Sequence, residues 1–240
     1  MTSVCYTPWK VPRVRVTKLN SCGLPVTGCS TVVSDGIISI GMTKEYEARE
    51  EFFVKNGDGV FCVRQTNPPI LKWINLELTF CNVDPEMVNI MSGNSMVAND
   101  AVAPSNAGYN IEEGAVALSN FAFEGWTRIA GNAGVACSGG VEYGYTLFPW
   151  VIEGTIGDVT FENGAANFVL NARTSANSLW GLGVYYVDYS DNPAGSTNNI
   201  ALLTPILSTQ HMRQFLTRKP PPAAACGCST LSSLTPSGPL

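Results

Sequence analysis

The dipeptide Asn163-Gly164 constrains this chain more than any other feature, because it separates two runs of alternating apolar and polar residues, 158–162 and 166–172. Asn and Gly tolerate the two positive φ angles of a type I′ turn, whose twist matches that of its flanking strands. We therefore expect an antiparallel β-hairpin here. A second hairpin is expected within 51–63, where two apolar runs flank the sequence Asn-Gly-Asp-Gly at 56–59.

Two further segments alternate in the manner of strands. In 73–81 (WINLELTFC) apolar and polar residues alternate from Ile74 onward, which predicts a half-buried antiparallel strand with one face in water. Its apolar face would hold Ile74, Leu76, Leu78 and Phe80, and its polar face Asn75, Glu77 and Thr79. In 12–19, Val14 and Val16 share one face, and Arg13, Arg15 and Thr17 share the other.

The remaining segments complete a mainly β organisation. Further strands are expected within 31–42, 115–129 and 200–217, and loops over 94–114 and 189–199. One short helix is expected at about 84–92, where Asp84 suits the N-cap, Pro85 the first helical position and Gly93 the end of the helix. The prediction is an antiparallel β-sandwich or small barrel over 1–217. Residues 218–240, rich in Pro, Ala and Ser, are expected to form a flexible tail.

The composition is poor in charge. Charged residues make up 14% of the chain, well below the roughly 25% of ordinary soluble domains. Two explanations stay open: copies of the chain cover much of its surface, or a strand-rich composition alone gives the low value. The formal net charge is −5, and no stripe of Lys and Arg would neutralise phosphates, so stable nucleic-acid binding is not expected. The sequence has no secretory h-region and no apolar run near the ~18 residues of a membrane helix, so neither element is expected.

The sequence offers little for catalysis. His211 has no Cys, Asp or Glu beside it, and the common hydrolase, nucleotide-binding and zinc-protease motifs do not occur. Glu153, Asp158 and Glu162 are the best carboxylates for a glycosidase acid–base pair. However, Asp158 and Glu162 stand near turns, where short polar side chains ordinarily bond the backbone, so we do not expect an enzyme.

Cysteines and aromatic residues each allow two interpretations. The eight cysteines lack zinc-site spacing and are expected mainly as small buried hydrophobic residues, with a Cys22–Cys29 disulfide as an alternative. Aromatic residues on strands form a core or a subunit interface more often than a sugar-binding platform. Trp126, Trp150 and Trp180 are therefore expected as packing anchors.

A series of motifs resembles the major tail tube proteins of long-tailed bacteriophages, particularly those of actinobacterial hosts. The motifs are SCGLPVTG, VVSDGIISI, NGDGVFCV, LELTFCNVDPEMVNIMSG, CSGGVEYGYTLFPWVIEGTIGDVTFENGAANFVLNARTS, LWGLG and LLTPIL, and the series covers most of residues 12–217. Each motif alone is weak, and their order and spacing carry the resemblance. Two places depart from the family pattern. Gly183-Val184-Tyr185 stands where Gly-Pro-Tyr is expected, and the cysteine-bearing tail after Arg218 has no counterpart.

The resemblance implies a structural virion protein that is made in the host cytoplasm and forms a homo-oligomeric ring, with six copies expected. Strands of neighbouring copies would join into one inner barrel, and stacked rings would form the tail tube through which DNA is ejected. Expected partners are the tape measure protein, the tail terminator and the baseplate or distal tail proteins. DNA would pass without sticking, and no cofactor, metal or membrane is implied.

The resemblance also suggests where the assembly contacts lie. The polar residues Asn75, Glu77 and Thr79 are the first candidates to face the lumen, and the strand within 115–127 is the second. The mixed-charge segment 44–59 would contact the adjacent ring through Glu45, Glu47, Arg49 and Glu50, unless it is only a solvated extension. A decoration or baseplate protein, a carbohydrate-binding module and a glycosidase are the alternatives.

Overall fold

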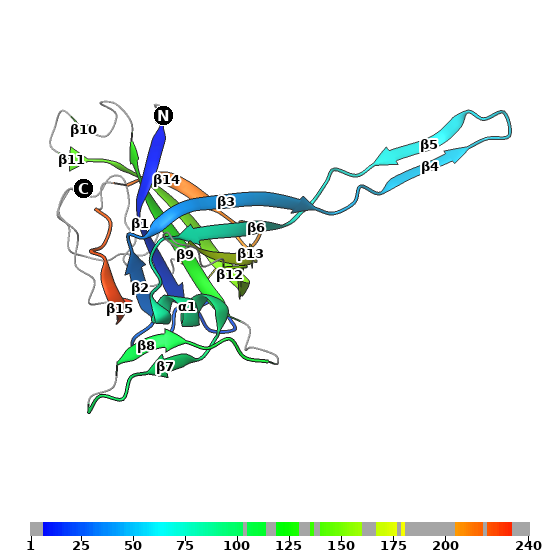
Figure 1. The fold of residues 1–240 in the computed structure, drawn as a ribbon. Coiled ribbons are helices and arrows are strands. Elements are labelled where there is room, and N and C mark those ends of the chain that lie inside the picture. Colours follow the sequence, from blue (N-terminus) through cyan, green and yellow to red (C-terminus); the bar gives the residue numbers. More distant parts are fainter. Residues whose placement is uncertain are drawn as a thin grey trace.

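A computed structural model describes residues 7–102, 105–113, 119–129, 135–136, 140–159, 167–176, 179–180, 205–217 and 220–231. This part of the chain is mainly β with one short helix, α1 (Pro85–Ser92) (Figure 1). The main sheet contains β1 (Pro8–Lys18), β2 (Thr31–Ser34), β3 (Ile37–Tyr46), β6 (Leu71–Phe80), β9 (Asn120–Ile129), β12 (Tyr143–Ile156), β13 (Phe168–Thr174), β14 (Arg213–Thr217) and β15 (Ala225–Ser229). Three two-stranded sheets pair β4 (Glu51–Lys55) with β5 (Phe61–Thr66), β7 (Met96–Ala98) with β8 (Asn106–Tyr109), and β10 (Val135–Ala136) with β11 (Gly140–Val141).

The main sheet is antiparallel and folds over on itself into a β-sandwich, which confirms the expected fold class. Its strand order is β15-β2-β1-β9-β12-β13-β6-β3, and β14 pairs with the first half of β12. Between Phe148 and Thr155, β12 contains two bulges, which bend a strand and increase its twist. As a result β3 faces β9 across the core: Ile40 Cδ1 lies 3.7 Å from the position that a Cβ on Gly125 would occupy.

The core lies between β1, β2 and β9 on one side and β6 and β13 on the other. In β6 the alternation predicted from the sequence is confirmed. The four residues of its predicted apolar face, Ile74, Leu76, Leu78 and Phe80, are all buried. Burying a side chain of this size contributes about 1.5–3 kcal/mol to stability. The intervening Asn75 and Glu77 are exposed and Thr79 is half-buried, so this strand has one wet face.

Helix α1 closes one end of the core, where the sequence predicts a helix. Asp84 is its N-cap, and one carboxylate oxygen accepts hydrogen bonds from the backbone N–H groups of Glu86 and Met87. Gly93 ends the helix with a φ of 77°, and its N–H bonds the carbonyl oxygen of Asn89. Met87 packs into the core with no exposed surface.

Residues 47–70 form an arm that projects from the body of the molecule (Figure 1). The arm continues β3 and β6 outward: the N–H of Glu47 bonds the carbonyl of Ile70, and β4 and β5 pair beyond that point. Asn56 closes the turn at the tip, because its side-chain oxygen accepts hydrogen bonds from the N–H groups of Asp58 and Val60. The hairpin expected within 51–63 is therefore confirmed.

Both faces of β1 and β9 are buried over residues 14–17 and 121–127, which the sequence pattern did not predict. Val14 faces the core, but Arg15 on the opposite face is also fully buried. A second hydrophobic cluster covers this opposite face with side chains that include Trp126, Tyr145, Leu147, Trp180 and Ile206. Residues 121–127 are all buried, so the expectation that 115–127 offers a polar face to a channel is wrong over these residues. Residues 114–118 lie outside the described part.

The C-terminal segment 220–231 corrects the expectation of a flexible tail. β15 pairs antiparallel with β2, and Cys228 forms a disulfide with Cys29, with the two Cα atoms 5.2 Å apart. The backbone N–H groups of Gly227 and Cys228 also donate to the carboxylates of Asp84 and Glu86, at 2.7 and 2.8 Å. Backbone pairing and a covalent bond hold this segment, so it needs no apolar periodicity to be ordered. Residues 218–219 and 232–240 are not described.

Three other segments refine the expected element boundaries. The strand expected within 31–42 is two strands, β2 and β3, because the chain turns at Asp35-Gly36. The loop expected over 94–114 contains β7 and β8, which are too short to give a periodic signal. β12 and β13, on either side of Asn163-Gly164, pair antiparallel, but β12 ends at Ile156, so residues 158–159 of the expected first strand are not in a strand. Residues 160–162, the dipeptide itself and the loop at 189–199 lie outside the described residues.

Candidate assembly surfaces

The polar side of β6 lies at the centre of an exposed sheet surface, which we call the outer face. Asn75, Glu77 and Thr79 pair with Thr43, Gly41 and Ser39 of β3 on one side and with Arg173, Asn171 and Val169 of β13 on the other. A shallow hollow lies over these three strands around Gly41 and Glu77. A Cβ at Gly41 would lie 3.3 Å from the Cβ of Glu77, so the absence of a side chain there keeps the hollow open.

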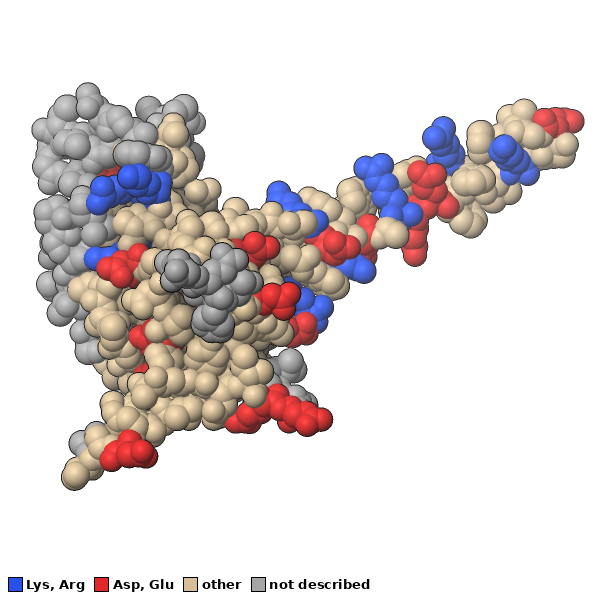
Figure 2. Space-filling model, viewed as in Figure 1, with Lys and Arg blue, Asp and Glu red and all other residues tan. Residues whose placement is uncertain are grey.

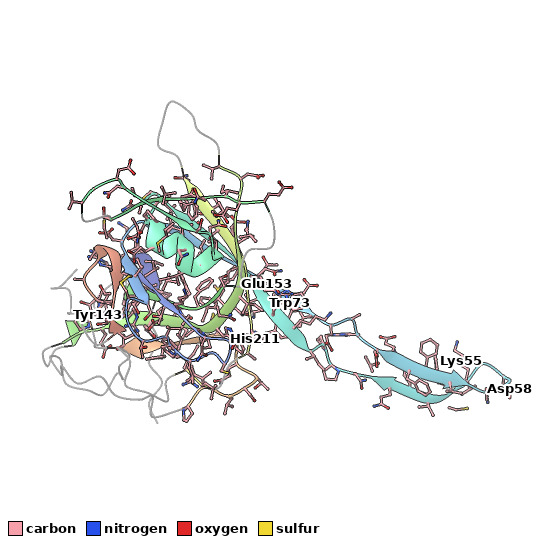
Figure 3. All side chains as sticks on the ribbon, turned by 90° about the horizontal axis from the view of Figure 1, so that it is seen from below. Lys55, Asp58, Trp73, Tyr143, Glu153 and His211 are labelled. Atoms are coloured by element: carbon pink, nitrogen blue, oxygen red, sulfur yellow. A yellow bond between two sulfur atoms is a disulfide. The ribbon has the colours of Figure 1, made fainter. Side chains whose placement is uncertain are left out.

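At the end of the outer face nearest the arm, Arg173 contacts two other side chains. It forms an ion pair with Glu153, and its guanidinium carbon lies 4.7 Å from the centre of the Trp73 ring. Figure 3 shows Trp73 and Glu153 near each other where the arm leaves the body. Glu153 sits at the second bulge of β12 with a φ of 57°, which is uncommon for a residue with a side chain. The charge of Arg173 is therefore matched within this surface.

The arm exposes large apolar side chains on both of its sides. Phe52, Phe53, Val54, Val60, Phe61 and Val63 are each 45–63% exposed. On one side, the rings of Phe53 and Phe61 meet edge to face, with 5.9 Å between their centres. Lys55 Nζ and the guanidinium carbon of Arg64 lie 4.7 and 5.9 Å from the centre of the Phe61 ring. We call Phe53, Lys55, Phe61 and Arg64 the aromatic face.

The four residues expected at a ring contact lie at the base of the arm. Glu45 is the second-last residue of β3, and the segment between β3 and β4 contains Glu47, Arg49 and Glu50. All four side chains are exposed. Charges of both signs follow one another along the arm (Figure 2). The sequence patterns did not predict the aromatic face, which lies beyond the base of the arm on β4 and β5. Its signal is the run Phe-Phe-Val at 52–54, which places apolar residues on both sides of a strand.

The three tryptophans expected as packing anchors lie in or against the second hydrophobic cluster. Trp126 and Trp180 are buried. Trp150 packs against this cluster and is half-buried, and its indole N–H donates to the side-chain oxygen of Asn120 at 2.9 Å. The described tryptophans of this set therefore do not form an open, sugar-binding platform.

A charged cluster lies beneath the second hydrophobic cluster. Arg15 donates two hydrogen bonds of 2.5 Å to the two carboxylate oxygens of Glu124, and both side chains are fully buried. The hydroxyl of Tyr145 donates to the same carboxylate at 2.5 Å. Burial raises the pKa of Tyr145, and the negative charge of Glu124 raises it further. Tyr145 is thus held in its protonated, donating form.

His211 and Glu153, two of the residues considered for catalysis, have structural partners. His211 Nδ1 lies 2.9 Å from Thr174 Oγ1, which also accepts a hydrogen bond from the N–H of Ile74. Burial lowers the pKa of His211. Glu153 is paired with Arg173. Asp158 lies beyond the end of β12, and Glu162 is outside the described residues.

The cysteines depart from the sequence expectation. Cys29 pairs with Cys228, so the Cys22–Cys29 alternative is wrong, and Cys22 is an exposed free thiol. The other free cysteines in the described part, Cys62, Cys81 and Cys226, are exposed as well. The Glu86 carboxylate lies with the Cys29 and Cys228 sulfur atoms, all within 4.8 Å of one another. Because these sulfur atoms are bonded to each other, neither is a thiolate ligand for a metal ion.

No protein-family model matches this chain, and no curated protein is significantly similar to it in sequence. Across the described ranges, no helix has the length and apolar character needed to cross a membrane. The outer face and the arm are therefore candidate functional surfaces on the strength of their geometry.

Proposed function

We propose that this chain is a non-catalytic virion protein whose copies assemble into stacked rings, which form the tail tube of a long-tailed bacteriophage. The tube is the conduit for DNA ejection. Its partners are further copies of the chain, a tape measure protein in the lumen, and the tail terminator and baseplate or distal tail proteins at the two ends. The protein is made in the host cytoplasm and resides in the virion.

The arm is the observation that carries this proposal. A two-stranded hairpin standing alone in water is marginally stable, and large exposed apolar patches generally mark interaction sites. The arm exposes Phe52, Phe53 and Phe61 with no described residue of the body over them. A segment built in this way gains stability when another molecule covers it. In a tail tube, that molecule is a neighbouring subunit.

The two free edges of the main sheet favour the proposal that copies of the chain join into a ring. β3 and β15 stand at the two ends of the strand order. Met42 of β3 is 53% exposed, although its partner Leu76 is buried. An exposed strand edge readily pairs with another chain, and closing a barrel removes such edges. Joining edges of neighbouring copies would cover the backbone groups and the apolar side chains at β3.

The chemistry of the outer face of the single molecule suits the inner wall of a channel in the assembled tube. Its central residues Asn75, Glu77 and Thr79 are polar or acidic, and the charge of Arg173 is matched by Glu153. DNA phosphates bind strongly to surfaces rich in unpaired Lys and Arg. A wall that lacks them lets DNA slide.

The test is negative-stain electron microscopy of the purified full chain over a range of concentrations, beside an arm-replacement variant. Glu47 and Ile70 already pair, so an Asn-Gly turn can replace residues 48–69 and close a short hairpin. We expect the full chain to form rings or tubes, and the variant to keep the circular dichroism spectrum and melting temperature of the body but stay monomeric.

Assembly that is equally efficient without the arm would overturn its role. Full-length chains that stay monomeric at every concentration would overturn the proposed function. A density map of the tube with Glu77 on the outer wall would remove the lumen assignment alone.

A further inference from the structure

The end of the body around β7 and β8 also lacks a cover. Large apolar side chains are exposed there: Met96, Val97, Val102 and Ile111. The β7–β8 end, as we call residues 95–102 and 105–113, thus matches the arm in exposing apolar side chains on a short two-stranded sheet. It lies at the opposite end of the body from β10 and β11, below α1 (Figure 1).

The charge of the β7–β8 end has one sign. It carries Asp100, Glu112 and Glu113, and the sequence contains no Lys or Arg between Lys72 and Arg128. Figure 2 shows only acidic side chains among the charged groups at this end of the visible face. This stretch of 55 residues without Lys or Arg contrasts with the arm and its base, because five of the fourteen Lys and Arg residues of the chain lie within 44–72.

The aromatic face of the arm has the complementary character. Lys55 and Arg64 flank the Phe61 ring there. Asp58 lies at the turn, and Glu51, two residues before Phe53 in β4, lies at the inner end of the same face. Figure 3 shows Asp58 at the tip, beyond Lys55. The aromatic face therefore offers two cations beside apolar rings, and the β7–β8 end offers carboxylates beside apolar side chains.

We propose that the arm of one copy docks through its aromatic face on the β7–β8 end of a second copy. This inference rests on the proposed function and names the receptor surface for the arm. Phe53 and Phe61 would cover Val97 and Ile111, while Lys55 and Arg64 approach Asp100 and Glu113. Opposite charges around an apolar contact direct association and set its register.

The two surfaces belong to different parts of the chain, and this determines what kind of assembly follows. A contact between unlike surfaces is heterologous, so each copy that docks leaves one free arm and one free receptor. Such contacts propagate into rings or open stacks rather than ending at a dimer. The arm has the reach for this contact, since its ten residues from Glu47 to Asn56 span roughly 30 Å at about 3.3 Å per residue.

Cross-linking tests the proposed contact directly, because Cys62 is an exposed free thiol on β5. The variant Val97→Cys places a second thiol on β7 in a chain that keeps Cys62 and the Cys29–Cys228 disulfide and in which each remaining cysteine is replaced by Ser. Mild oxidation should then give a ladder of disulfide-linked oligomers. The control places the second thiol at Leu207, which is 60% exposed but lies outside the β7–β8 end, and should give no ladder.

Charge exchange tests the pairing independently. Lys55→Glu with Arg64→Glu should raise the critical concentration for assembly about tenfold, as should Asp100→Lys with Glu113→Lys, because each double variant replaces two attractive charge pairs by two repulsive ones. All four substitutions in one chain, or a mixture of the two double variants, should return it close to the wild-type value. Glu112 is left unchanged because its carboxylate accepts a hydrogen bond from Ser95.

The outcomes separate this inference from the function on which it rests. If arm replacement abolishes assembly but the Val97→Cys ladder does not exceed the Leu207→Cys control, the β7–β8 end is not the receptor and the proposed function stands. If the double variants assemble like wild type, the charge pairing is wrong. If the arm-replacement variant assembles normally, both the docking contact and the role of the arm fail together.

Discussion

At the scale of single residues, the cluster of Arg15, Glu124 and Tyr145 is the most sensitive point of the fold. Removing one partner of a buried ion pair leaves the other charge uncompensated and costs about 3–5 kcal/mol. We expect Glu124→Gln to lower the free energy of unfolding by this amount in urea denaturation followed by circular dichroism. The control is Glu153→Gln, whose ion pair is about a third exposed and should cost at most about 1 kcal/mol. Equal losses for the two variants would contradict this account.

A second single-residue prediction concerns His211 and pH. Burial lowers the pKa of His211 in the folded state, so the unfolded chain takes up a proton first as the pH falls. The stability that depends on neutral His211 is complete above the unfolded pKa of about 6.5 and is lost as the pH falls through that value toward the folded pKa. His211→Gln keeps a group that can accept the Thr174 hydroxyl proton but does not titrate. Melting temperatures from pH 8 to pH 5 should fall more steeply for wild type than for this variant, and parallel curves would refute the prediction.

At the scale of elements, β15 shows how a segment without an apolar pattern becomes part of a sheet. It pairs with β2 at Ala225 and Ser229, and its Gly227 N–H reaches the N-cap residue of α1. Asp84 therefore caps α1 through one carboxylate oxygen and holds β15 through the other. The disulfide to Cys29 spans 199 residues of sequence, so breaking it releases a long loop in the unfolded state.

Removal of this disulfide gives the prediction for the element. Cys228→Ser should lower the free energy of unfolding by about 2–4 kcal/mol under oxidising conditions, and reductant should bring wild type to the same value. The matched control is Cys226→Ser, because Cys226 lies in the same strand with a free thiol. Hydrogen exchange at residues 225–229 should accelerate in Cys228→Ser alone. A stability equal to that of the Cys226→Ser control would show that hydrogen bonds suffice to hold β15.

Sequence patterns predicted those elements whose structure depends on near neighbours. β6 alternates because one of its faces meets the core and the other meets water, and α1 begins and ends at its own capping residues, Asp84 and Gly93. The turn of the arm is likewise closed by Asn56, within the hairpin itself. In each case the residues that determine the structure lie inside the segment.

The elements that escaped prediction depend on residues far away in the sequence. Arg15 reads as a surface residue, yet Glu124 pairs with it and a distant cluster that includes Trp180 covers it. β15 is ordered by Cys29 and the start of α1. The arm shows the opposite case. Its hairpin was predicted from the sequence, but its projection away from the body, with apolar residues exposed on both sides, was not. No local pattern reports whether another part of the chain will cover a strand.

At the scale of the whole molecule, charge is distributed unevenly, and this distribution bears on the transport of DNA. The net charge of −5 comes from 19 acidic and 14 basic residues, and five of the basic residues lie within 44–72, on the arm and its base. From Trp73 to Thr127, a stretch that contains most of β6 and all of α1, β7 and β8, every Asp, Glu, Lys or Arg residue is acidic. In the proposed tube, the surface left to face DNA is the outer face with Glu77 at its centre. Its acidic character would keep phosphates from binding.

Replacing Glu77 by Lys tests this distribution on the assembled protein. Glu77 is exposed, and its removal disturbs no core contact, so Glu77→Lys should still form tubes of normal appearance. A lysine on every subunit would line the channel with cations, and binding through phosphates weakens steeply as salt rises. We expect tubes of the variant to retain short duplex DNA in sedimentation at 50 mM salt and to release it at 200 mM, whereas wild-type tubes retain none at either concentration. The control is Asp35→Lys, which makes the same change of charge between β2 and β3, where the Asp35 side chain is 60% exposed and pairs with Arg13. Retention by both variants would mean that net charge, rather than the outer face, governs DNA binding.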